Sequence, residues 1–178
     1  MFAPYPLWSS CPGGAFAVYD PNRNALRRVD PPGEDLGVVR LPAEQRVPLN
    51  AQGLFDMTYR QIRDEMPSAQ RPDSAEWRRL MDEQFARLGP RGADVFPEYA
   101  DLRCAPDGTV WLQPFDVRGG AFGRGPRWLE IDEDGGVRTW TFPDRFRPYA
   151  FTRDRVWGTT ADELGILSVA WVEAGRSR

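Results

Sequence analysis

The stretch that decides the fold is Asp101-Leu-Arg-Cys-Ala-Pro-Asp-Gly-Thr-Val-Trp-Leu112, in which two short β patterns flank the turn signal Pro106-Asp107-Gly108. Its second half has a weak copy in Asp154-Arg-Val-Trp157, where a turn again precedes a Val-Trp strand. Trp157 lies 46 residues after Trp111. A period of about 40–50 residues is typical of propeller blades, each of which is one small antiparallel sheet. The repeat therefore predicts blades in series.

An earlier copy is proposed in Pro12-Gly-Gly-Ala-Phe16, with Phe16 placed 95 residues before Trp111. This separation of 95 residues exceeds one 46-residue period by about the length of the helical segment that lies between the two copies. Further β patterns, separated by Gly, Pro and Asp turns, extend to both ends of the chain. The strands predicted are 15–20, 26–29, 36–41, 101–105, 109–115, 127–132, 137–142, 149–152, 155–160 and 166–172.

Residues 54–88 have a helical pattern. Between Leu54 and Met66 the apolar residues fall on one helix face, and Pro67 ends the pattern. A second helix follows Asp73, which can cap it, and Gly89-Pro90 closes it. Its apolar stripe is Trp77, Leu80, Met81, Phe85 and Leu88. We expect this stripe to pack against the sheets, with docking of a protein partner as the alternative.

Composition excludes several classes of function. The 178 residues carry a net charge of −3, and all 23 basic residues are Arg, spread along the chain among 26 acids. A nucleic-acid binder concentrates positive charge on one face, so nucleic acid is disfavoured. The absence of histidine excludes Ser-His-Asp and Cys-His catalysis and His-ligated zinc within this sequence.

Cys11 and Cys104 are too few for a disulfide framework or a structural zinc site. They could pair in an exported protein, but we favour two small buried apolar residues. The stretch at Met1 has no signal-peptide pattern, and no segment is long and apolar enough to span a membrane. The expected compartment is the periplasm or cell envelope if a parent protein carries a signal peptide, and otherwise the cytoplasm.

The stretch from Phe96 to Leu112 resembles the penultimate-blade motif of bacterial six-bladed β-propeller proteins of the NHL-like type, in which Pro-x-Tyr-x-Asp-Leu leads into Asp-Gly-x-Leu-Trp-Val. Trp128-Leu-Glu-Ile-Asp132, Phe142-Pro143 and Asp162-Glu-Leu-Gly-Ile166 resemble the closing hairpins of that group. The resemblance implies the C-terminal half of such a propeller and a truncated open reading frame or fragment. Its motifs are turn and core signatures, so it implies a fold and no particular activity.

The predicted fold is an all-β partial β-propeller of four-stranded antiparallel blades with a two-helix insertion. We expect a first blade in 1–49, the helical insertion in 50–95, a second blade in 96–146, a partial last blade in 147–173 and a disordered tail in 174–178. Half a ring leaves blade edges and faces exposed, which predicts self-association. The last strand is apolar on both faces and so requires cover on both.

No catalytic, cofactor-binding or metal-binding residue is predicted. Asp132-Glu-Asp-Gly135 is interpreted as a hairpin turn because the later ligands of a calcium loop are missing, and Asp162-Glu163 as another hairpin tip. Ser9-Ser10 lacks the context of a nucleophile, and the Gly-rich stretch 119–125 lacks the Lys of a phosphate loop.

Six tryptophans, in or beside strands, are expected to fill blade interfaces rather than form a sugar platform; they are Trp8, Trp111, Trp128, Trp140, Trp157 and Trp171. The functional prediction is a non-enzymatic binding or scaffold module for an unknown protein or small-molecule ligand. The alternative is a metal-dependent lactonase or hydrolase with Asp and Glu in a central channel.

Overall fold

The computed structural model of the protein describes residues 6–44, 48–50, 52–53, 55–56, 58–59, 73–88, 95–117, 125–143, 145–152, 154–162 and 164–173. The chain forms two compact units. A helical unit comprises 1–5, 43–100 and 114–125, and a sheet unit comprises 6–42, 101–113 and 126–178.

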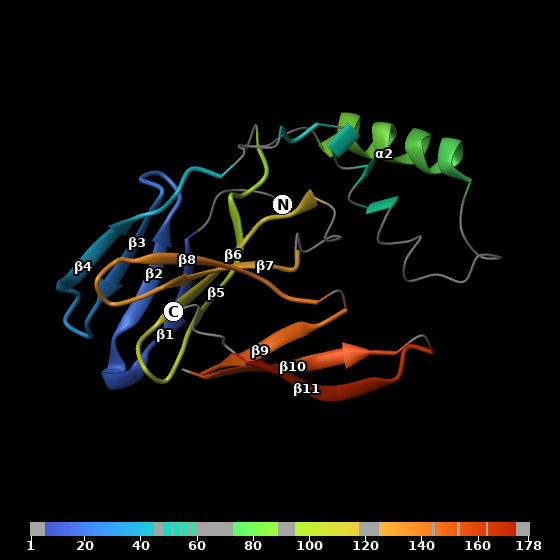
Figure 1. Cartoon of the computed structure of the whole chain (residues 1–178). Coiled ribbons are helices and arrows are strands. Elements are labelled where there is room, and N and C mark those ends of the chain that lie inside the picture. The colour runs from blue at the N-terminus through green and yellow to red at the C-terminus, as the bar shows by residue number, and fades with distance from the viewer. Residues whose placement is uncertain are drawn as a thin grey trace. The chain divides into compact units, whose positions relative to one another are not determined.

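The first sheet is an antiparallel meander of β1 (Leu7–Ser10), β2 (Phe16–Asp20), β3 (Ala25–Val29) and β4 (Asp35–Arg40) (Figure 1). Because side chains alternate across a strand, one face carries Ala17, Tyr19 and Leu26, which are at most 2% exposed. The opposite face includes Trp8 and Val38, which are 66% and 56% exposed. This sheet therefore buries one face only.

The middle sheet consists of β5 (Tyr99–Cys104), β6 (Val110–Pro114), β7 (Arg127–Ile131) and β8 (Val137–Thr141), in that order (Figure 1). It is buried on both faces at its centre. Val110 pairs with Ile131 on one face, and both are fully buried. Trp111 and Trp128 project from the other face and are 2% exposed. A sheet covered on both sides in this way is an internal layer of the sheet unit.

The last sheet has three strands in the order β11 (Leu167–Glu173), β10 (Arg155–Ala161) and β9 (Arg147–Phe151). Its buried face joins the aromatic core of the middle sheet. The ring of Phe151 stacks on Trp111 with centroids 4.5 Å apart and lies 4.9 Å from Trp128. Val156 is fully buried in the same cluster. The middle and last sheets are therefore held together by apolar and aromatic packing.

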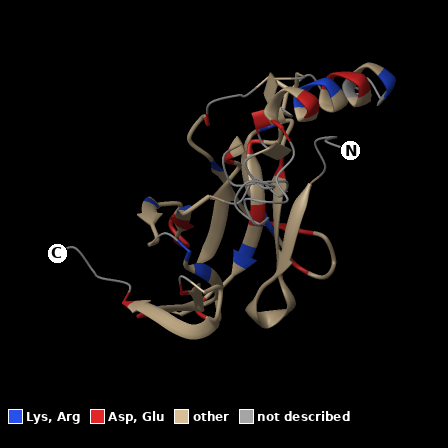
Figure 2. Cartoon of the chain, turned by 90° about the vertical axis from the view of Figure 1, so that its right-hand side faces the viewer, with Lys and Arg blue, Asp and Glu red and all other residues tan. Residues whose placement is uncertain are grey.

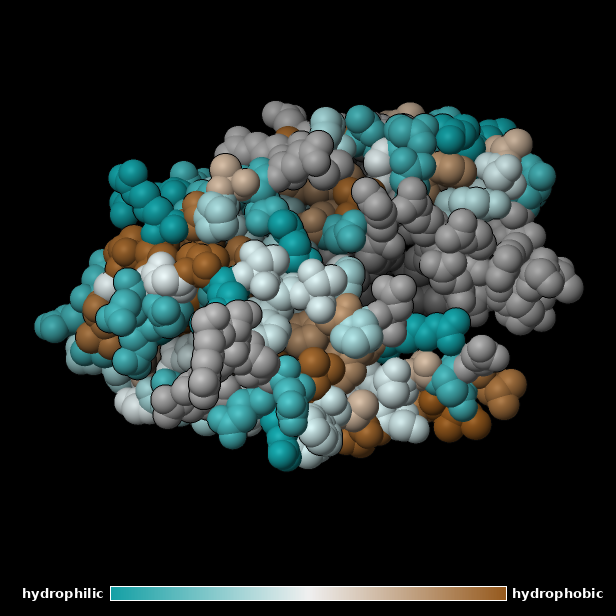
Figure 3. Space-filling view, viewed as in Figure 1, coloured by the Kyte–Doolittle hydropathy of each residue, from teal (hydrophilic) through white to brown (hydrophobic). Residues whose placement is uncertain are grey.

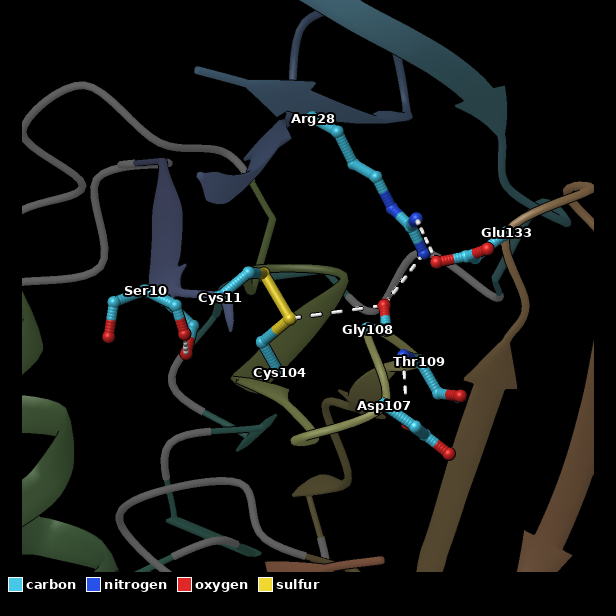
Figure 4. Close-up of a disulfide and its surroundings, with 9 residues drawn as sticks. Ser10, Cys11, Arg28, Cys104, Asp107, Gly108, Thr109 and Glu133 are labelled. Atoms are coloured by element: carbon cyan, nitrogen blue, oxygen red, sulfur yellow. Dashed lines mark hydrogen bonds and ion pairs between the residues drawn. A yellow bond between two sulfur atoms is a disulfide. The ribbon is translucent and has the colours of Figure 1, made fainter. Parts of the chain in front are cut away.

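The first and middle sheets are joined by covalent and polar contacts (Figure 4). Cys11, after β1, forms a disulfide with Cys104 of β5, with their Cα atoms 5.2 Å apart. Arg28 of β3 donates from Nη2 to the carbonyl oxygen of Gly108 at 2.8 Å, and its Nη1 lies 3.9 Å from a carboxylate oxygen of Glu133. The interpretation of the cysteines as two separate buried thiols is wrong. The folded hairpins bring both cysteines to the contact between the first and middle sheets. Their separation of 93 residues gives no sign of this contact in the sequence.

Three hairpins use the same five-residue turn, which begins at Asp30, Asp132 and Asp162. In each turn the aspartate side chain accepts a hydrogen bond from the backbone N–H four residues later. The fourth residue is a glycine with φ between 80° and 92°, a conformation that residues with a Cβ rarely adopt. Both acidic stretches of the sequence, at Asp132 and Asp162, thus serve as turns, as predicted.

The all-β class with four-stranded antiparallel sheets is confirmed. Every predicted strand is present, with bounds shifted by at most two residues. β1 was not among the predicted strands, because Leu7–Ser10 is short and adjoins prolines. The predicted blade boundaries stay a prediction.

The alignment predicted for the earlier copy of the repeat, which matched Phe16 with Trp111, is wrong by one residue. Cys11 N–H donates to the carbonyl of Ala15, and Ala105 N–H donates to the carbonyl of Thr109. These matching turns align Phe16 with Val110 rather than with Trp111.

The second predicted helix is confirmed as α2 (Ser74–Leu88). The Oδ1 atom of Asp73 accepts the N–H groups of Ala75 and Glu76 at 2.8 and 3.3 Å, which caps its first turn. Trp77 Nε1 donates to Thr58 Oγ1, and Met81 is 4% exposed. Trp77 of the stripe therefore contacts the preceding segment of the helical unit. Of the first predicted helix, helical residues are seen between 52 and 59, and its remainder from 60 on lies outside the described residues, as do the side chains of Phe85 and Leu88.

Candidate interaction surface

The outer face of the last sheet is an exposed apolar surface. We name it the C-terminal face and define it by Trp157, Leu167, Val169 and Trp171. Trp157 pairs with Trp171 across β10 and β11, while Val169 and Leu167 pair with Thr159 and Ala161 on the same face. The exposed fractions of the four defining residues are 37% for Trp157, 68% for Leu167, 77% for Val169 and 44% for Trp171. Figure 3 shows hydrophobic residues over the β10–β11 region at the lower right. A contiguous patch of large apolar side chains is typical of an interaction site.

The exposure of this face is explained by the repeat. Trp111 is the second residue of β6 after a turn, and Trp157 follows a fully buried valine in the same way on β10. Alternation turns Val110 and Val156 to one side of their sheets and both tryptophans to the other. The last sheet covers Trp111, whereas within the described residues no further sheet lies on Trp157. The expected cover on both faces of the last strand is therefore absent from the described part of the chain.

Charge at the C-terminal face lies at Arg155 and Glu173 at one end and at Arg147 of β9, which pairs with Thr159 in the row that holds Val169. The Arg155 guanidinium lies 4.5 Å from the ring centroid of Trp171, a cation–π geometry, and Arg155 pairs with Glu173 across the strands. Figure 2 shows Arg and acidic segments interspersed along the chain. The four defining side chains are apolar and the charges around them are of both signs, which suits a polypeptide surface better than a polyanion.

The tryptophans divide into two groups. Trp111 and Trp128 are buried between sheets, and Trp140 packs against the same cluster, as expected for blade interfaces. Trp8, Trp157 and Trp171 are exposed instead. The sequence could not separate the groups, because each tryptophan sits in a similar strand pattern and its burial depends on the neighbouring sheet.

A small open hollow on the middle sheet is the other candidate site. It has a volume of about 240 Å³ and is lined by Glu130, Asp132, Gly136, Val137 and Arg138. Glu130 Oε2 accepts hydrogen bonds from Trp140 Nε1 at 2.7 Å and from Arg138 Nη1 at 3.2 Å. Asp132 is engaged in the hairpin turn. The two carboxylates therefore stabilise the sheet and its turn.

The remaining stretches singled out in the sequence contribute no site. Ser9 and Ser10 lie on β1, where Ser9 Oγ donates to the carbonyl of Ser10 at 3.4 Å. Residues 118–124 of the Gly-rich stretch lie outside the described residues. Across the described ranges, no three Asp, Glu or Cys side chains are grouped as a metal site, and no helix has the length and hydropathy to cross a bilayer.

Comparisons with known proteins give structural neighbours only. No protein-family model matches the chain, and no curated protein matches it. A crystal structure of virginiamycin B lyase from Staphylococcus aureus aligns with a TM-score of 0.40 and 12% identity, over 94% of this chain and 41% of the lyase. A streptogramin B lyase structure aligns with a TM-score of 0.39 and 11% identity, over 97% of this chain and 42% of that chain. The chain thus spans about two-fifths of the length of these two propeller proteins.

Proposed function

We propose that the protein is a non-catalytic binding module of the β-propeller type, which takes a polypeptide partner on its C-terminal face. The observation that carries this proposal is the pair Trp157 and Trp171, side by side with centroids 6.4 Å apart and both partly exposed. Aromatic side chains supply much of the binding energy in protein interfaces, since each buries a large area with few rotatable bonds.

Further features of the proposal concern the parent fold. The three meander sheets are the blades of a six-bladed, NHL-like propeller, with the boundaries 1–49, 96–146 and 147–173 and the insertion 50–95. The support is the four-strand meander and the 46-residue spacing of Trp111 and Trp157. The metal-dependent hydrolase alternative stays a prediction.

The proposal also includes an oxidising compartment, the periplasm or cell envelope. Its support is the Cys11–Cys104 disulfide, because such bonds persist where thiols are not kept reduced. Alkylation of the protein under denaturing conditions, directly from its native cells, tests this by mass spectrometry. We expect no label on either cysteine, whereas labelling of both would place the chain in a reducing compartment.

Site-specific photo-crosslinking tests the binding function. A photoreactive phenylalanine analogue at Val169 places the probe at the centre of the C-terminal face. The same analogue at Ser168 is the matched control, because this exposed neighbour on β11 projects to the opposite side of the strand. In the native cells we expect Val169 to crosslink to one defined polypeptide and Ser168 not to do so. No adduct at either position, or equal diffuse labelling at both, would contradict the proposal.

A further inference from the structure

We infer that the partner of the C-terminal face is a second copy of this chain, which docks the outer face of its own first sheet there. This inference rests on the proposed binding function and names its partner. Two copies of the three described sheets would close head to tail into one six-sheet ring.

The outer face of the first sheet is a second exposed apolar surface. We name it the N-terminal face and define it by Trp8, Phe16, Leu36 and Val38. Strand pairing places Trp8, Val18, Arg27 and Val38 in one row across the four strands. The rings of Trp8 and Phe16 meet edge to face with centroids 6.1 Å apart. The four side chains are 66%, 37%, 59% and 56% exposed.

The two faces lie at opposite ends of the sheet unit. The first sheet contacts the middle sheet through the side that bears Arg28, which is opposite to the side bearing Trp8. The last sheet contacts the middle sheet through Phe151 and Val156, opposite to Trp157. One chain therefore presents two different apolar ends, and a pair that closes head to tail buries both.

The contact between the middle and last sheets is the template for the proposed interface. There Trp111 meets Phe151, in the cluster that also holds Val156, on the sheet that follows. Trp157 occupies the position on its sheet that Trp111 occupies on the middle sheet. The hairpin alignment makes Phe16 the equivalent of Val110 and therefore of Val156. A second copy's first sheet thus offers Phe16 at the position of Val156, while Ser10, which pairs with Phe16, stands at the position of Phe151.

The available area is sufficient for a stable dimer. The exposed parts of the four defining side chains amount to roughly 450 Å² on each face. Two face-to-face contacts then bury about 1,800 Å² in total, within the range of specific protein interfaces. The N-terminal face itself carries charge, because Arg27 lies in its central row and forms a salt bridge with Asp35 at 2.6 Å, and Arg40 pairs with Ala25 on the same face. Docking an apolar sheet there leaves no single unpaired charge from the Arg27–Asp35 pair.

Light scattering coupled to gel filtration, on the full chain, tests the inference with two variants. We expect about 40 kDa for the wild type, twice the 20.2 kDa of one chain. Val38→Lys on the N-terminal face and Val169→Asp on the C-terminal face should each give single chains. Each variant raises the dissociation constant about 100-fold or more, because the new charge is buried at both contacts. Val137→Lys, at a 40% exposed valine of the middle sheet, is the matched control and should remain paired.

Mixing the two variants is the decisive step. A head-to-tail pair of one Val38→Lys chain and one Val169→Asp chain keeps one unaltered contact and places opposite charges at the other. The mixture should therefore return to about 40 kDa, twice the mass of one chain. Far-ultraviolet circular dichroism of each variant confirms that its β structure is intact. Failure of the mixture to associate, or a Val38→Lys variant that remains paired, would overturn the head-to-tail arrangement.

A wild type that remains a single chain would overturn the second-copy inference. If Val169 then still crosslinks to a different polypeptide, the binding function stands with another partner. If Val169 crosslinks to nothing, the binding function fails as well.

Discussion

Trp111 and Trp157 stand at equivalent points of two neighbouring sheets and have opposite environments. Each follows a fully buried valine near the start of a second strand. Trp111 is 2% exposed because Phe151 of the next sheet covers it, and Trp157 is 37% exposed. The same local sequence thus makes a core residue in one sheet and a surface residue in the next. The presence of a following sheet, not the strand itself, decides which role the tryptophan has.

Truncation of Trp111, compared with truncation of Trp157, should give the largest change in the free energy of unfolding. Trp111→Ala removes a ring stacked between sheets and should lower the free energy of unfolding by about 4 kcal/mol, the usual cost of emptying a buried aromatic site. Trp157→Ala should lower it by less, about 2 kcal/mol, because part of this side chain is already exposed in the single chain. Urea unfolding of both variants in a Val38→Lys background, where association is removed, measures the difference. Equal losses would contradict the distinction between covered and uncovered sheets.

Loss of the disulfide should have the next largest effect on stability, because this bond holds the first sheet to the middle sheet. Replacement of both Cys11 and Cys104 by Ser should cost about 3 kcal/mol, since the bond closes a long loop in the unfolded chain. The first sheet should then lose hydrogen-exchange protection before the last sheet does. Earlier exchange in β9–β11 would show that the aromatic contact between the middle and last sheets is weaker than the contact between the first and middle sheets.

Arg28 should have the smallest effect at the contact between the first and middle sheets. Its guanidinium is held by the Gly108 carbonyl at 2.8 Å and is 22% exposed, while its partner Glu133 is 73% exposed. Arg28→Met keeps the apolar stem and removes the donors, so we expect a loss of about 1 kcal/mol. Glu133→Gln is the matched control and should be nearly neutral. A loss as large as that of the disulfide variant would mean that the ion pair is shielded from water.

The sequence predicted local structure well, because local signals determine it. Turns such as Asp162–Ile166 and the cap at Asp73 are set by residues a few positions apart, and they form as predicted. Contacts between sheets were predicted poorly. The disulfide joins residues 93 positions apart, and nothing near Cys11 indicates that Cys104 will meet it.

The exposure of the C-terminal face could not be predicted either, because it also depends on contacts between sheets that are far apart in the sequence. Alternation along the last strand puts Val169 and Trp171 on one face, but a face that is exposed and a face that another sheet covers have the same sequence pattern. The expectation of exposed blade faces came from counting strands, and the structure supplied which side chains they carry. The N-terminal face was not foreseen, because β1, which carries Trp8, was not predicted.

The central claim is that the outer tryptophans form a contact surface while the inner ones hold the sheets together. Fluorine NMR of protein labelled with 5-fluorotryptophan tests this claim directly, with each of the seven signals assigned by a Trp→Phe variant. On dilution from associated to single chains, the signals of Trp8, Trp157 and Trp171 should shift and those of Trp111 and Trp128 should not. Outer signals that stay constant across the dilution, or that shift together with the inner ones, would contradict the account.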